Sequence, residues 1–84
     1  MTNQEMIEIL KKIVSPYVQD QEAFEKLSET TNFIDDLKIN SANLVDVILD
    51  VEDEFDIEIE DQQMEEMLTV EAAIKIITEK IKAK

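Results

Sequence analysis

The chain has 84 residues, of which 21 are acidic and 8 are lysines, and its net charge is −13. A chain of this length forms one domain, residues 1–84, and a charge this negative repels nucleic acid and anionic membranes but attracts basic protein surfaces. The absence of cysteine, histidine and glycine excludes disulfides, thiol and imidazole catalysis, zinc fingers and glycine-rich phosphate loops.

A first amphipathic helix is predicted after Thr2, which can form a capping box with Glu5. Its apolar stripe has spacings of four, three and four residues: Met6, Leu10, Ile13 and Tyr17. Pro16 should end or kink this helix near Ser15.

A long connection over residues 18–40 follows. Asp20 can start a short helical turn that runs through Leu27. Phe33 and Leu37, four residues apart, are predicted to be anchors in the core. A loop this long in a compact domain is usually functional or ordered by its own packing.

The second main helix is predicted over residues 41–55, although two patterns compete there. Apolar residues alternate in a strand-like way from Val45 to Val51. The helical period is the stronger pattern because it also includes the aspartates, and Ile48 breaks the alternation. About fifteen residues without a breaker also favour a helix.

Two further helices complete the predicted all-α fold. Asp61 should cap a short helix that contains Met64, Met67 and Leu68, and Thr69 should cap the last helix. The predicted buried stripe of the last helix is Val70, Ala73, Ile74, Ile77 and Ile81. No apolar run exceeds three residues, so neither a transmembrane helix nor a signal peptide is predicted, and we expect a cytoplasmic monomer.

The second main helix carries an acidic face, at Asp46, Asp50, Asp53 and Glu54. Residues 35–61 contain eleven acids and one lysine, Lys38. Like charges at this spacing destabilise a helix slightly. The face is therefore either an ordinary solvated surface or, as we favour, a docking surface for basic partners.

Ser41 stands at the start of this helix. A serine there is usually only a cap, and Asn40 or Ser41 could serve as one. A helix N-terminus also stabilises a phosphate ester, because its N–H groups and dipole carry partial positive charge. Ser41 is thus suited to carry a phosphodiester-linked group.

The stretch around Ser41 resembles the acyl carrier protein family. The family motif F-x-x-D-L-G-x-D-S-L stands here as FIDDLKINSA, residues 33–42, and is followed by VDV, EDEF and TVEAAI at residues 45, 52 and 69. The resemblance covers nearly the whole chain. It implies a four-helix bundle with a short third helix and a long loop between helices 1 and 2.

The resemblance also implies a function. Ser41 would receive 4′-phosphopantetheine from coenzyme A through a separate transferase, and the arm would hold acyl groups as thioesters. The carrier itself would perform no chemistry and would deliver its cargo to enzymes of fatty-acid or specialised acyl or polyketide-type biosynthesis. No catalytic residue and no metal site are expected.

Two sets of residues are predicted to support this role. The partner-docking set combines family positions with the acidic face and the neighbours of Ser41: Asp36, Asn40, Ala42, Asp46, Asp50, Glu52 and Asp53. The acyl-pocket set matches family pocket or core positions: Val45, Ile48, Val51, Phe55, Ile59, Met64, Met67 and Ala73.

Three residues depart from the family motif: Lys38 replaces a glycine, Asn40 an aspartate and Ala42 a leucine. They suggest a specialised carrier rather than a housekeeping one. The alternative function is an acidic interaction module without an arm, such as an adaptor, an inhibitor or a nucleic-acid mimic.

Overall fold

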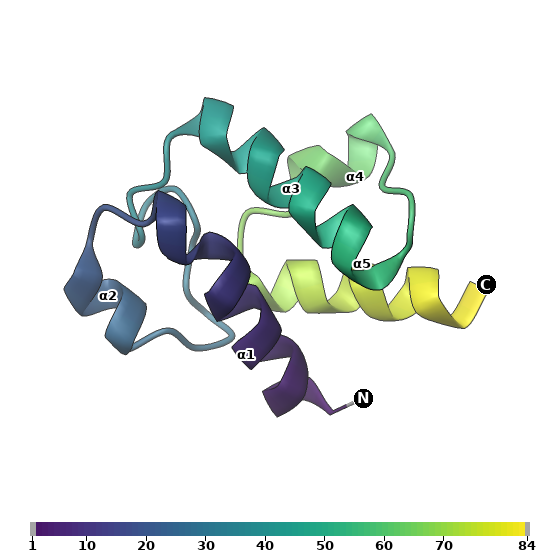
Figure 1. The fold of residues 1–84 in the computed structure, drawn as a ribbon, viewed down its shortest axis with the longest axis horizontal. Coiled ribbons are helices and arrows are strands. Elements are labelled where there is room, and N and C mark those ends of the chain that lie inside the picture. Colours follow the sequence, from purple (N-terminus) through teal and green to yellow (C-terminus); the bar gives the residue numbers. More distant parts are fainter. Residues whose placement is uncertain (1, 84) are drawn as a thin grey trace.

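The computed structural model describes residues 2–83. Its elements are α1 (Asn3–Val14), the 3₁₀ turn η1 (Ser15–Tyr17), α2 (Gln21–Glu25), α3 (Ser41–Phe55), α4 (Asp61–Glu66) and α5 (Val70–Ala83). Figure 1 shows α3 running above α5, with α1 crossing in front and α4 behind α3. The predicted four-helix bundle is confirmed, with α4 as its short third helix and α2 within the long loop.

The predicted start of α1 is confirmed. Thr2 Oγ1 accepts a hydrogen bond from the Glu5 backbone N–H, and the Glu5 carboxylate accepts one from the Thr2 N–H, both in a capping box. The hydrogen bonds that the Glu5 carboxylate accepts, first from the Thr2 N–H and then from the Thr2 hydroxyl, lower the pKa of Glu5 below its usual 4.5. After Val14, Pro16 lies in the 3₁₀ turn, as expected of a residue that cannot continue an α-helix.

The start of α4 differs from the prediction by one residue. Glu60, not Asp61, is its N-cap, and the Glu60 N–H donates to Gln63 Oε1 at 3.2 Å. The helix also ends earlier than predicted, because Met67 leaves helical geometry at φ −82° and ψ 59°. Met67 and Leu68 therefore follow the helix rather than belonging to it.

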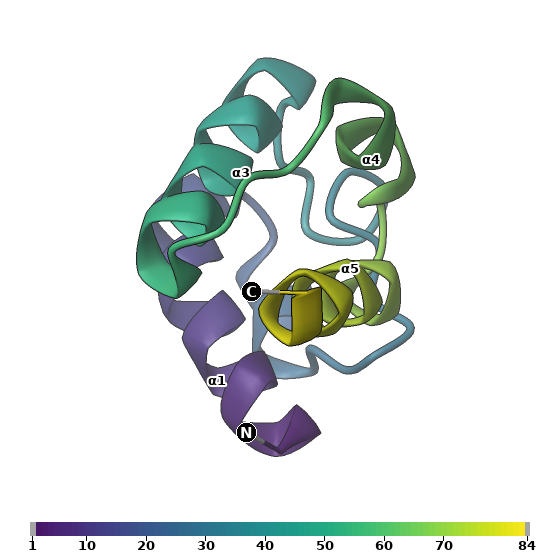
Figure 2. The same cartoon turned by 90° about the vertical axis from the view of Figure 1, so that its right-hand side faces the viewer.

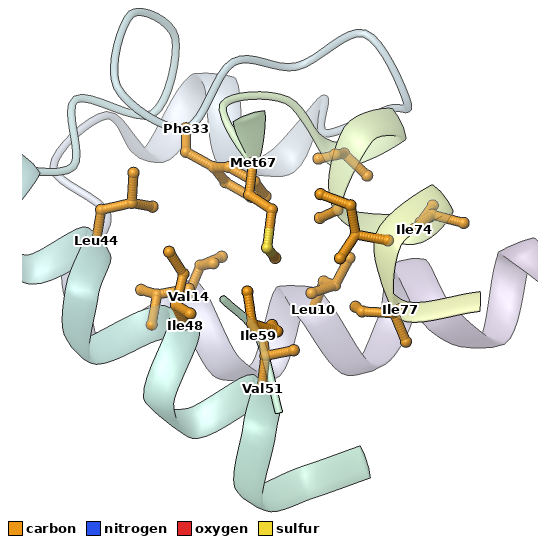
Figure 3. Close-up of a cluster of buried hydrophobic side chains, with 14 of the residues drawn as sticks. Leu10, Val14, Phe33, Leu44, Ile48, Val51, Ile59, Met67, Ile74 and Ile77 are labelled. Atoms are coloured by element: carbon orange, nitrogen blue, oxygen red, sulfur yellow. The ribbon is translucent and has the colours of Figure 1, made fainter. Parts of the chain in front are cut away.

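The core lies between α1, α3 and α5. Three residues of α1 are buried, namely Met6, Leu10 and Val14, and α5 buries Val70, Ala73, Ile74, Ile76 and Ile77. Figure 3 shows Leu44, Ile48 and Val51 of α3 pointing toward Met67, Ile74 and Ile77. Within the predicted stripes, Ile13, Tyr17 and Ile81 are only half-buried, whereas Ile76 is buried although it was not predicted.

The long loop is ordered by its own packing, as predicted. Phe33 and Leu37 are both buried, and the Phe33 N–H donates to the Leu68 carbonyl at 2.8 Å. An antiparallel bridge joins Asn32 to Thr69. Figure 2, turned by 90°, shows this loop passing beside α4 and α5. The loop thus ties the start of α3 to the connection between α4 and α5.

Candidate functional site around Ser41

The turn before Ser41 is held by buried neighbours. Leu37 is 0% exposed and Ile39 is 1% exposed, and Lys38 lies between them. The Leu37 carbonyl accepts hydrogen bonds from the N–H groups of Gln19 and Asp20, and the Ile39 N–H donates to the Phe33 carbonyl. Lys38 itself has φ 60°, in the left-handed region. This conformation explains why a glycine would suit the position.

Ser41 is the first residue of α3, and Asn40 is its cap. Asn40 Oδ1 accepts a hydrogen bond from the Ala42 N–H at 2.8 Å. Within residues 2–83 the Ser41 hydroxyl has no hydrogen-bond partner, and the residue is exposed. The structure therefore decides between the two possible caps. It leaves the Ser41 hydroxyl exposed to solvent and not needed as the cap.

An apolar hollow of about 330 Å³ opens beside Ser41, between α3 and α4. Its walls come from the loop, from α3 and from the region of α4: Ile34, Ser41, Leu44, Val45, Ile48, Met64, Glu65 and Leu68. Six of these eight side chains are apolar. Such a wall can shelter a hydrocarbon chain attached near Ser41.

The exposed face of α3 is acidic. Asp46, Asp50 and Asp53 are all exposed, and the Tyr17 hydroxyl donates to Asp50 Oδ2 at 3.4 Å. Desolvation of Tyr17, followed by the charges of Asp50 and Asp46, raises the pKa of this tyrosine above its usual 10.0. The face thus combines a negative charge with side chains that reach solvent.

Residues 8–77 match the family model described as the phosphopantetheine attachment site. An acyl carrier protein of Caulobacter vibrioides is 41% identical over 76 residues, which are 90% of this chain and 95% of that protein. One from Buchnera aphidicola subsp. Schizaphis graminum is 38% identical over 73 residues, 87% of this chain and 90% of that protein. The chain belongs to the acyl carrier protein family.

A solved structure of an acyl carrier protein from Enterococcus faecalis supports the same assignment. It superposes with a TM-score of 0.76 at 31% identity and covers 95% of this chain and 99% of that one. Members of the acyl carrier protein family are carriers rather than enzymes, and their prosthetic group is 4′-phosphopantetheine. They work with a transferase and with acyl-processing enzymes.

The surroundings of Ser41 fit such a prosthetic group. The hydroxyl is exposed, and Asn40 supplies the cap. The N-terminus of α3, a helix of fifteen residues, can stabilise a phosphodiester at this position.

No helix within residues 2–83 has the length and apolar character needed to cross a membrane.

The predicted acyl-pocket residues separate into two layers. Val45, Ile48 and Met64 line the hollow. Below it, Val51, Ile59, Met67 and Ala73 are buried in the core, and Phe55 packs half-buried against it. Figure 3 shows Val51, Ile59 and Met67 within one cluster of side chains. Three of the eight predicted residues therefore line the hollow beside Ser41. The other five belong to the core or pack against it.

The predicted docking residues also differ in their surroundings. Ala42, Asp46, Asp50 and Asp53 are exposed along α3, whereas Glu52 is half-buried and accepts a hydrogen bond from the Ile59 N–H at 2.9 Å. Glu52 thus holds the connection between α3 and α4. Asp36 is exposed, and its carboxylate accepts the Asn32 N–H at 2.7 Å.

The sequence did not predict Leu49 or Leu68 for this site, and it placed Val45 only in the acyl pocket. Val45 and Leu49 are 48% and 49% exposed on α3, and Leu68 is 41% exposed beside the hollow. Val45 and Leu49 stand four residues apart, so helical spacing alone could have placed them together on the acidic helix. The exposure of Leu68 depends on where α4 ends, which the sequence does not show.

Proposed function

We propose that Ser41 carries the 4′-phosphopantetheine arm and that this protein transports apolar acyl chains as thioesters of that arm. The observation that carries the proposal is the exposed Ser41 hydroxyl at the start of α3, directly beside an apolar hollow. When bound, the arm supplies a thiol for the thioester. The protein supplies an accessible attachment point, a helix N-terminus for the phosphate and an apolar surface for the cargo.

The hollow gives the cargo its chemical class. Polar groups on its wall are limited to the Ser41 hydroxyl and the Glu65 carboxylate, so an aliphatic chain fits better than a heavily hydroxylated one. A chain would first contact Val45, Ile48 and Met64. Longer chains would reach the deeper residues, such as Val51 and Met67, as those side chains repack. A fatty-acid-type cargo is therefore the best supported one.

The partner enzymes would dock on the exposed side of α3. Asp46, Asp50 and Asp53 provide the charge for a basic surface, and Val45 and Leu49 provide apolar area on the same helix. Charge of this kind mainly raises association rate and specificity. The net charge of −13 opposes self-association, in keeping with a monomer.

Intact mass spectrometry after incubation with coenzyme A, Mg²⁺ and a broad-specificity phosphopantetheinyl transferase tests the attachment. The unmodified parent should gain the mass of one phosphopantetheine, and Ser41→Ala should gain none. Ser28→Ala is the matched control, since Ser28 is an exposed serine in the long loop, and it should be modified like the parent. If the parent stays unmodified with the host's own transferases as well, an acidic interaction module without an arm becomes the better explanation.

A further inference from the structure

The charges around Ser41 differ from those on the rest of α3. From Leu37 to Val45 the one charged residue is Lys38, and the nearest acids on either side are Asp36 and Asp46. From Asp46 to Glu71 every charged residue is acidic. A partner that lies along α3 would therefore meet negative charge over most of its footprint and a positive charge at the Ser41 end.

Lys38 is held in place by its neighbours. Leu37 and Ile39 are both buried, and backbone hydrogen bonds fix the turn on each side of Lys38. The side chain of Lys38 is exposed. A non-glycine residue at φ 60° is costly, so the chain keeps a cation where the backbone would be more stable with a glycine.

The Lys38 ammonium group is also available to a partner. The ion pairs found within residues 2–83 join Lys26 to Glu22 and Lys80 to Glu60, and neither involves Lys38. Its charge is not neutralised by an ion pair in the fold. It therefore contributes to whatever surface approaches Ser41.

We infer that Lys38 is a specificity-determining residue for the transferase that modifies Ser41. It selects a transferase with an acidic side chain opposite the turn and disfavours one whose docking surface is basic up to its catalytic centre. Like charges brought together at an interface weaken wrong pairings, while the acidic face of α3 still attracts the correct one. This inference rests on the proposed attachment at Ser41.

The test uses a phosphopantetheinyl transferase with a uniformly basic docking surface and compares kcat/KM for the parent, Lys38→Gln and Lys38→Glu. Removing one repulsive surface pair and then creating an attractive one should raise kcat/KM about twofold and about fivefold. The gain should shrink at high salt, because salt screens exposed charges. Lys75→Glu on α5 makes the same change in net charge away from Ser41 and should alter kcat/KM by less than about twofold.

The outcomes separate the two proposals. If all variants are modified at the parent's rate, or if Lys38→Glu is slower, Ser41 remains the attachment site and the role of Lys38 is wrong. If Lys75→Glu accelerates modification as much as Lys38→Glu, net charge explains the effect and the role of Lys38 is again wrong. If no variant gains the arm with any transferase, both proposals fail. Lys38→Gln keeps the result interpretable if charge reversal disturbs the turn.

Discussion

The contact between α1 and α5 and the surroundings of Ser41 differ in how completely they are packed. Leu10 and Val14 of α1 and Ile77 of α5 are 1%, 0% and 0% exposed. In contrast, α4 has no fully buried residue, and Leu68 beyond its end is 41% exposed. The apolar hollow lies in this less tightly packed region, between α3 and α4. Under the proposed function, stability and cargo binding would therefore use different parts of one small apolar interior.

The difference indicates that α4 opens more readily than α1, α3 and α5, each of which has buried residues. A segment with few buried apolar contacts opens at a lower free energy than the core. Its connection to α3 is held by the hydrogen bond from the Ile59 N–H to Glu52, and Glu60 meets Lys80 at 3.9 Å. These contacts keep α4 in place while leaving its apolar side against the hollow.

The largest expected difference is between side-chain truncations in the core and beside the hollow. Ile77→Ala should destabilise the protein by about 3 kcal/mol, because it leaves a cavity in the core, whereas Met64→Ala should cost about 1 kcal/mol because Met64 is only half-buried. Urea denaturation monitored by circular dichroism measures both. Equal losses would contradict the division into two regions.

Substitutions of two adjacent residues at the start of α3 should differ in their effect on the free energy of unfolding. Asn40→Ala removes the cap and should cost about 1 kcal/mol. Ser41→Ala should change the free energy of unfolding by less than about 0.5 kcal/mol, because alanine is a good helix former and the Ser41 hydroxyl makes no hydrogen bond within residues 2–83. Thermal melts of the two variants check this order. A larger loss for Ser41→Ala would mean that Ser41 has a structural role.

Lys38→Gly should stabilise the protein by roughly 0.5 to 1 kcal/mol, since glycine relieves the left-handed conformation at the cost of some chain entropy. The same substitution at Lys75, inside α5, should cost about 1 kcal/mol. Chemical denaturation of both variants tests the pair. Destabilisation by Lys38→Gly would show that the turn does not strain the backbone.

The smallest effect concerns Tyr17, the one tyrosine of the chain. Its pKa is raised, so the native state favours the neutral phenol; the resulting stability is present below pH 10.0 and is lost as the pH rises through the native pKa. Asp50→Asn removes a nearby charge and leaves only a neutral amide oxygen to accept from the Tyr17 hydroxyl, so it should lower this pKa. An ultraviolet titration of tyrosinate follows it directly. An unchanged midpoint in Asp50→Asn would argue against that contact.

Much of the fold could be predicted because strong local patterns agree with it. The capping box at Thr2, the fifteen residues of α3 and the cap at Thr69, whose Oγ1 accepts the Ala72 N–H at 3.1 Å, all follow from residue type and spacing. The bounds of α4 were less predictable, because several neighbouring acids can each cap a helix. Ile76 was missed since it packs on a side of α5 outside the simple stripe.

The site was only partly predictable for a different reason. Family positions identify apolar residues near a cargo, but they do not tell a wall of the hollow from the core beneath it. Ile48 and Met67 look equivalent in the sequence, yet only Ile48 lines the hollow. Leu68 was missed because its exposure depends on tertiary packing. The left-handed geometry of Lys38 was foreseeable only from the glycine that it replaces.

The central claim is that the core between α1 and α5 supports the fold while the hollow beside Ser41 holds the acyl chain. Its most direct test is methyl NMR of the protein with an empty arm and with an octanoyl-loaded arm on Ser41. The account predicts that the largest shift changes occur at Leu44, Ile48, Met64 and Leu68, with Leu10 and Ile77 nearly unchanged. Changes centred on the contact between α1 and α5, or no changes at all, would contradict it and would mean that the hollow beside Ser41 does not hold the acyl chain.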